Sequence, residues 1–167
     1  MVQDVRGNVD TRLRKLSSGD YDAMILAAAA LIRLQRTSTI SQWLPLTLML
    51  PAAGQGALAV EVRESDEEVT ALVQPLNHLP TERAVAAERA FLSALGGGCT
   101  VPVAAHAAVA HGRLILQGLV ANLNGKRVIC DSLSGPPLQA EDIGRRLADR
   151  MLSQGAAQIL REAESGQ

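Results

Sequence analysis

Residues 81–99 read TERAVAAERAFLSALGGGC, and this stretch decides how the second half of the chain folds. Its apolar residues recur at helical spacing, which predicts an amphipathic helix over residues 81–95. The glycines at 96–98 end that helix, because glycine readily adopts the positive φ values at which helices stop. Cys99 follows them with little steric cover, so its thiol is a candidate nucleophile for a bulky partner. The alternative is a small buried hydrophobe, as most lone cysteines are.

Three strand-like runs follow this helix, at residues 103–110, 113–123 and 127–133. The dipeptides His111-Gly112 and Asn124-Gly125 separate them and are typical of hairpin turns, so the runs predict a three-stranded antiparallel meander. Amphipathic stretches at residues 140–152 and 156–164 then predict two helices, with Gly155 capping the first. Residues 79–167 therefore predict a small α+β domain in which this sheet packs on helices.

The first part of the chain has a different pattern. Residues 22–26 and 57–63 have the character of short strands, and a helix is predicted over residues 27–36. Ser65 and Glu68 have capping-box spacing and predict a further helix start. Strands that alternate with helices favour an α/β partial parallel-sheet segment. Such a segment leaves sheet edges uncovered, so we expect a homodimer or a chain that needs a missing N-terminal half.

Composition limits the possible classes of protein. The chain has 167 residues, of which 47% are hydrophobic and 2% aromatic, so a core of aliphatic residues is feasible. The net charge of −1 argues against nucleic acid or an anionic membrane as a partner. The longest apolar run, residues 23–32, is too short to cross a bilayer. These features favour a globular protein that neither spans nor binds a membrane.

The cysteines and histidines show no metal-binding spacing, so we expect no metal site. Two cysteines without a disulfide pattern favour the reducing cytoplasm as the location. Cys130 lies in the apolar run Val128-Ile129-Cys130, which predicts a buried and unreactive thiol. Cys99 is therefore expected to be the reactive cysteine.

Three segments together carry a resemblance to a known family. They are Arg6-Gly7-Asn8-Val9-Asp10-Thr11-Arg12-Leu13, Pro51-Ala52-Ala53-Gly54-Gln55-Gly56-Ala57-Leu58, and Ala87-Glu88-Arg89-Ala90-Phe91-Leu92 with Gly97-Gly98-Cys99-Thr100-Val101-Pro102-Val103. Their order and content resemble the porphobilinogen deaminases, also called hydroxymethylbilane synthases. The resemblance runs over essentially the whole chain.

The resemblance implies a transferase of tetrapyrrole and heme biosynthesis that joins four porphobilinogen units with loss of ammonia. It also implies a dipyrromethane cofactor held by a thioether at Cys99. Arg6 and Arg12 match family positions that bind carboxylates of the cofactor or substrate, and Arg33 matches an arginine that contacts the pyrrole chain. Arginine suits these roles because its planar fork pairs bidentately with carboxylate.

Gln55 and Gly56 match the return strand that lies near the family's active-site cleft, and they are the remaining substrate-binding candidates. A hinge or tight turn is the alternative for such a glycine-rich pair. The resemblance also implies three divisions of the chain. Residues 1–56 correspond to a remnant of the second, α/β domain, residues 57–78 to the returning strand and helix of the first, and residues 79–167 to the C-terminal domain.

The family's catalytic aspartate belongs to a segment that has no counterpart in this sequence, so no residue is assigned as catalytic. We therefore expect a truncated chain with little activity alone. Two alternatives stay open at this stage. One is a non-catalytic module that binds pyrrole carboxylates, and the other is a self-associating structural fragment.

Overall fold

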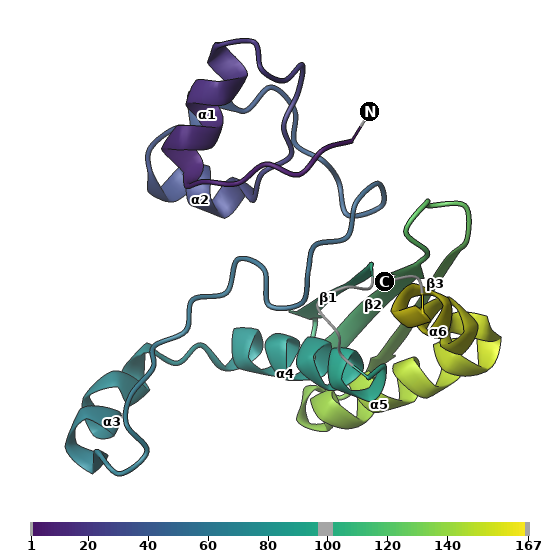
Figure 1. Cartoon of the computed structure of the whole chain (residues 1–167). Coiled ribbons are helices and arrows are strands. Elements are labelled where there is room, and N and C mark those ends of the chain that lie inside the picture. Colours follow the sequence, from purple (N-terminus) through teal and green to yellow (C-terminus); the bar gives the residue numbers. More distant parts are fainter. Residues whose placement is uncertain (1, 97–101, 166–167) are drawn as a thin grey trace. The chain divides into compact units, whose positions relative to one another are not determined.

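The computed structural model describes residues 2–96 and 102–165, in two compact units (Figure 1). The first unit is Met1–Pro45 and contains helix α1 (Val9–Ser17), helix α2 (Ala28–Arg33) and the 3-10 turn η1 (Thr37–Thr39). Leu31 is its buried apolar side chain. So small a core indicates that this unit derives little stability from apolar burial.

The second unit, Leu46–Gln167, holds the sheet and the larger helices. Its elements in order are α3 (Glu67–Val73), η2 (Gln74–Leu76), α4 (Leu79–Ala94), β1 (Val103–Ala110), β2 (Arg113–Ala121), β3 (Val128–Gly135), η3 (Pro137–Gln139), α5 (Ala140–Met151), the π-helical turn η4 (Leu152–Ala156) and α6 (Ala157–Ser165).

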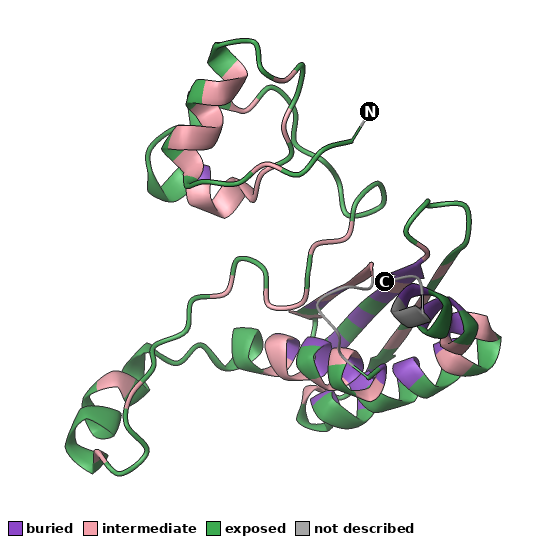
Figure 2. Cartoon of the chain, in the orientation of Figure 1, coloured by how far each residue is buried: buried purple, intermediate pink, exposed green. Residues whose placement is uncertain are grey.

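The three strands form one antiparallel sheet in the order β1-β2-β3. Helices α4 and α5 pack on one face of this sheet (Figure 1). The core between the layers contains Phe91, Leu116, Leu147 and Met151, all completely buried. Figure 2 shows that buried residues concentrate in this sheet and its helices, whereas α3 is largely exposed. The predicted α+β arrangement of a three-stranded sheet on helices is confirmed.

Close packing of α4 on α5 depends on Gly144. A Cβ atom at this position would collide with the backbone carbonyl of Ala87 and lie 2.8 Å from the Cβ of Ala90. Glycine therefore lets the two helix backbones approach, because any side chain on α5 here would need the space that α4 occupies. The same contact places residues 87–91 of α4 directly against the domain core.

The predicted parallel-sheet segment is wrong for the part of the chain that the structure describes. Residues 22–26 and 57–63 have no strand pairing, and all described strand pairs are antiparallel and lie between residues 103 and 135. The physical reason is the need for a partner, since a strand is stable only when its backbone groups pair with a neighbour. Leu58 and Val60 remain 73% and 60% exposed.

Two local predictions also need correction. The cap of α3 is Asp66 rather than Ser65, because its Oδ1 accepts from the amide of Val69 at 3.1 Å. Cys130 is exposed, not buried. Alternation along β3 directs Ile129 toward the helices and Cys130 to the opposite, uncovered face.

Within the described residues, no helix is both long and apolar enough to cross a membrane.

Candidate functional site

The first unit builds its arginine-bearing turn from a glycine and an asparagine. Gly7 has a φ of +121°, and an added Cβ would lie 2.9 Å from Cγ2 of Thr11, so only glycine fits without strain. Asn8 then caps α1, since its Oδ1 accepts from the amide of Thr11 at 2.9 Å. The turn therefore places Arg6 just before the N-terminus of a capped helix.

Arg12 is held by this turn. Its Nε donates to the carbonyl of Gly7 at 2.8 Å, and the side chain is half-buried. The two terminal guanidinium nitrogens have no partner among the described residues. A guanidinium oriented through Nε presents its terminal nitrogens together, which is the geometry that binds a carboxylate bidentately. Arg6 is exposed, and its backbone carbonyl accepts from Nζ of Lys15 at 3.5 Å.

Arg33 lies in the last turn of α2 and is exposed. It shares the first unit with Arg6 and Arg12. The helix is short, and its C-terminal end favours a cation. The three arginines that the sequence predicts to bind carboxylates therefore lie on one compact unit. Arg6 and Arg12 are at the N-terminal turn of α1, and Arg33 is at the end of α2.

The second unit contains the other substrate-binding candidates, Gln55 and Gly56, in two successive turns. The amide of Gln55 donates to the carbonyl of Ala52 at 3.0 Å, and the amide of Ala57 donates to the carbonyl of Gly54 at 3.2 Å. Gly54 is the third residue of the first turn, with a φ of +74°, and Gly56 is the third residue of the second turn, with a φ of +86°. Positive φ at this position is what a type II turn requires. The glycines therefore lie in tight turns, and contact of Gln55 and Gly56 with substrate stays a prediction.

This pair of turns is attached to the sheet by hydrogen bonds. The amide of Ala105 on β1 donates to the carbonyl of Pro51 at 3.1 Å. Glu88 on α4 is buried, and its Oε2 accepts from the amide of Gly54 at 2.7 Å. The segment that carries Gln55 and Gly56 is thus connected to both α4 and the edge of the sheet.

Cys99 lies outside the described residues, so its role as the tether stays a prediction. The described residues that precede it end at Gly96, whose φ of +87° terminates α4 as the sequence predicts. An open hollow of about 440 Å³ lies beside this helix end, lined by Arg89, Leu92, Ser93 and Gly96. An arginine that lines this hollow therefore precedes the predicted tether by only a short stretch of sequence.

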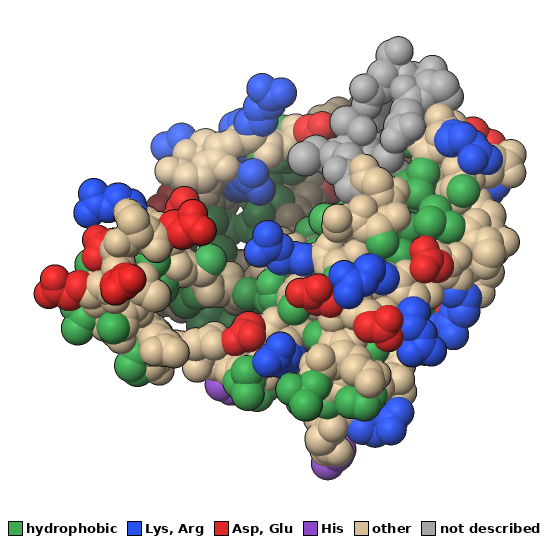
Figure 3. Space-filling model, turned by 90° about the horizontal axis from the view of Figure 1, so that it is seen from below, with side chains coloured by type: hydrophobic (Ala, Val, Ile, Leu, Met, Phe, Trp, Pro, Cys, Tyr) green, Lys and Arg blue, Asp and Glu red, His purple; other side chains and the backbone are tan. Residues whose placement is uncertain are grey.

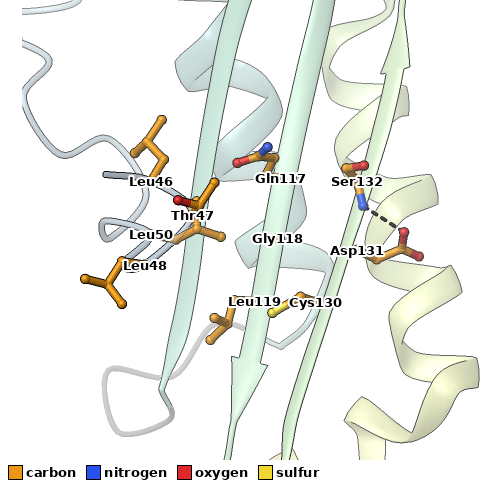
Figure 4. Close-up of a pocket in the computed structure, with 10 residues that line it drawn as sticks. All are labelled: Leu46, Thr47, Leu48, Leu50, Gln117, Gly118, Leu119, Cys130, Asp131 and Ser132. Atoms are coloured by element: carbon orange, nitrogen blue, oxygen red, sulfur yellow. Dashed lines mark hydrogen bonds between the residues drawn. The ribbon is translucent and has the colours of Figure 1, made fainter. Parts of the chain in front are cut away.

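A separate hollow of about 400 Å³ lies over the uncovered face of the sheet (Figure 4). One wall is the segment 46–50, and the floor comes from the middle of β2 and β3, including Leu119 and Cys130. Figure 4 shows the Cys130 sulfur beside Leu119 on this floor. The lining side chains that come from the second unit include apolar groups such as Leu48 and polar groups such as Gln117 and Ser132, and none of them is an arginine or lysine.

Asp131 lies next to this hollow and connects β3 to the helices. It forms an ion pair with Nε of Arg150 at 2.6 Å and accepts from Nε2 of Gln154 at 3.1 Å. Desolvation acts to raise the pKa of Asp131, but the hydrogen bonds from the Ser132 amide and Gln154, with the attraction of Arg150, lower it below its ordinary value of 3.8. The carboxylate is therefore ionised at neutral pH and has a structural role.

The described residues contain no cluster of three or more His, Cys, Asp or Glu side chains that could hold a metal ion. Figure 3 shows acidic and basic side chains interspersed over most of the visible face. The arrangement is consistent with a net charge of −1. The described residues of the face in this view therefore form no broad basic surface.

Sequence reasoning missed Glu88. The sequence feature that could have identified Glu88 is its place in the apolar stripe of α4. It lies one turn from Ala84 and one turn from Phe91, both of which are buried. A charged residue in a core-facing stripe needs buried partners. That requirement alone is enough to predict a hydrogen-bonding role for Glu88.

These features define a class of protein: an α+β domain with one open sheet face, preceded by a helical unit in which a tight turn orients the Arg12 guanidinium. The chain belongs to the porphobilinogen deaminase family. Residues 1–71 match the family model "Porphobilinogen deaminase, dipyromethane cofactor binding domain", and residues 83–153 match "Porphobilinogen deaminase, C-terminal domain".

Known relatives agree with this assignment. The chain is 49% identical over 160 residues to a porphobilinogen deaminase of Synechococcus elongatus, a match that covers 96% of this chain and 50% of that protein. It is 48% identical over 165 residues to the porphobilinogen deaminase of Moorella thermoacetica, with 98% and 53% covered. The chain spans about half the length of the curated relatives it matches.

Proposed function

We propose that this chain binds the carboxylates of porphobilinogen and of a dipyrromethane cofactor, as part of a hydroxymethylbilane synthase activity in tetrapyrrole biosynthesis. The observation that carries this proposal is the orientation of Arg12 by the carbonyl of Gly7. It presents a guanidinium fork beside the positive end of α1, and this turn lies within the region that matches the cofactor-binding domain model.

Arg6 and Arg12 would hold carboxylates of the cofactor, and Arg33 with Gln55 and Gly56 would contact substrate. The exposed or half-buried state of the arginines fits a group with several carboxylates, because each fork remains open to a ligand. The dipyrromethane, when bound, supplies the primer to which pyrrole units are added. The residues of this chain bind, orient and neutralise its charge.

We assign the covalent attachment to Cys99. The thiol sulfur of Cys99 would form a C–S bond with the aminomethyl carbon of a porphobilinogen unit. The C–N bond of that carbon breaks, and the proton of the thiol leaves with the nitrogen as ammonia. Cys99 would thus hold a dipyrromethane made from two such units, and its free ring carbon would be the site at which further pyrrole units are added.

Intact mass measured after incubation of the purified chain with porphobilinogen tests this function. The matched variants are Cys99→Ser and Cys130→Ser. We expect an adduct with the mass of two pyrrole units on the wild type and on Cys130→Ser, and none on Cys99→Ser. An adduct that persists in Cys99→Ser contradicts the tether assignment. An unmodified wild-type chain that still binds porphobilinogen indicates the non-catalytic binding module instead.

The domain limits implied by the family are also part of the proposal: residues 1–56 from the second domain, 57–78 from the first, and 79–167 as the C-terminal domain. The exposure of apolar side chains in the middle segment supports this division, since Leu72 and Leu76 are 72% and 71% exposed. Surfaces of this kind are normally covered by another part of a protein. We propose that the partner is a polypeptide that corresponds to the N-terminal half of the relatives, or a second copy of the chain.

A further inference from the structure

Glu88 has an unusual environment for a carboxylate. It is 6% exposed and lies on the core-facing side of α4, near Ala84 and Phe91. Burying a charge is costly unless hydrogen bonds replace the lost water. Here both oxygens accept from backbone amides: Oε1 from Ala107 at 2.6 Å and Oε2 from Gly54 at 2.7 Å. Charge-assisted bonds of this length are strong.

The amide of Ala107 belongs to an edge strand. Strand β1 has β2 on one side only, so its outward-facing amides need other acceptors. Pro51 supplies one acceptor, to the amide of Ala105, and Glu88 supplies the next, to the amide of Ala107. The carboxylate therefore takes the place of a neighbouring strand at this point.

The second oxygen of Glu88 extends this connection to the glycine turns. It holds the amide of Gly54, which is the third residue of the first turn and the first residue of the second. Gln55 and Gly56 follow immediately in the chain. One side chain thus joins helix α4, the sheet edge and both turns.

We propose that Glu88 is a positioning residue: its carboxylate holds the two turns of residues 52–57 against β1 and so orients Gln55 and Gly56 for the pyrrole substrate. The effect on binding rests on the proposed function, in which these two residues contact substrate. The attachment of the turns to β1 by Glu88 rests only on the hydrogen bonds of its carboxylate. A purely structural Glu88, in contrast, would serve only to satisfy the amide of Ala107 within the core.

The test compares Glu88→Gln with Glu141→Gln in the full chain. Glutamine keeps the size of the side chain but offers one acceptor instead of two, so one of the two amides loses its bond. Glu141 undergoes the same chemical change on the exposed surface of α5, where it pairs only with Arg145 among the described residues. Amide hydrogen exchange and the affinity for porphobilinogen are measured for both variants and the wild type.

We expect the amide of Gly54 to exchange at least about tenfold faster in Glu88→Gln, while the amides of β2 keep their protection. We also expect porphobilinogen to bind about tenfold more weakly to this variant. Glu141→Gln should match the wild type in both measurements. Uniform loss of protection through the core, with affinity unchanged, would overturn the positioning role.

The wild-type chain provides a second measurement that needs no variant, in case Glu88→Gln does not fold. The Gly54 amide must exchange slowly there, because it is bonded to a buried carboxylate; exchange at the rate of an unstructured amide overturns the proposal. Failure of the wild type to bind porphobilinogen would refute the proposed function. In that case faster Gly54 exchange in the variant would still support the hold of Glu88 on the turns.

Discussion

Arg12 and Arg14 differ in environment although both lie on α1. Arg12 is half-buried and donates to the Gly7 carbonyl, whereas Arg14 is exposed. The same substitution at the two positions therefore separates a role in ligand binding from a general effect of charge. Such a comparison is informative because lysine preserves the charge but loses the planar fork.

Replacement of Arg12 by lysine should weaken porphobilinogen binding by about tenfold, because bidentate pairing with a carboxylate is lost. Isothermal titration of the full chain measures the affinity. Arg14→Lys is the control and should bind like the wild type. Equal affinities for all three proteins would show that Arg12 does not contact the ligand.

The accessibility of the Cys130 thiol differs from the sequence prediction, because the sequence predicts a buried thiol and the structure exposes it. We expect iodoacetamide to label Cys130 in the native chain at a rate within about tenfold of that in urea, since access limits the reaction of a buried thiol. Peptide mapping measures the rate, and Cys130→Ser identifies the peptide. Strong protection in the native chain would contradict the exposure.

The contact between α4 and α5 is decided by one glycine. Alanine normally stabilises a helix interior relative to glycine by up to about 1 kcal/mol. At position 144 the added methyl group would collide with α4 near Ala87 and Ala90. Packing and helix propensity therefore predict opposite signs for the same substitution.

We expect Gly144→Ala to lower the free energy of unfolding by about 1–3 kcal/mol, because overpacking between two helices outweighs the gain in propensity. Urea denaturation followed by circular dichroism measures the change. Asp149→Ala, at an exposed position of the same helix, should stay within about 0.5 kcal/mol of the wild type. Stabilisation by Gly144→Ala would show that the helices are not in close contact.

The junction of β3 with α5 and η4 depends on ionisation of Asp131. Its folded-state pKa is lower than its ordinary value of 3.8, so it contributes stability above about that pH. This stability is lost as the pH falls through the folded-state pKa and the carboxylate loses its attraction to Arg150. Thermal unfolding between about pH 2 and pH 6 should therefore show a smaller acid-dependent loss for Asp131→Asn than for the wild type. Identical pH profiles would contradict the role of the ion pair.

At the scale of the whole molecule, the two parts of the chain differ in how much apolar surface they bury. The sheet and its helices form one core, whereas residues 57–76 keep Leu58, Val60, Leu72 and Leu76 exposed. Exposed apolar side chains of this kind favour association with another polypeptide. This difference in buried apolar surface predicts a stable C-terminal domain joined to a segment that binds another polypeptide.

We expect sedimentation equilibrium of the full chain to show association that increases with protein concentration. The variant Leu58→Lys/Leu72→Lys should reduce this association, because each lysine places a charge on the apolar segment. Ile115→Lys, on the uncovered face of the sheet, is the matched control. A wild-type chain that stays monomeric at all concentrations would show that these residues do not mediate contact between copies.

The α+β domain could be predicted from sequence, because its local signals are strong. The bounds of β1 are the predicted ones, and the turn at His111-Gly112 and the helix end at Gly96 follow from residues that tolerate positive φ. The family motifs identified the candidate arginines and the Gln55-Gly56 segment in the same way, from short stretches whose residue types carry the chemistry.

Which side of β3 faces the helices depends on tertiary packing, and the observed orientation reverses the prediction for Cys130. Tertiary packing also leaves the strand-like residues 57–63 unpaired, because no neighbouring strand is available to them in the described chain. The contact of Glu88 with Gly54 joins residues that lie 34 positions apart. Local sequence signals specify backbone conformation, but partners distant in the chain meet only when the core forms around them.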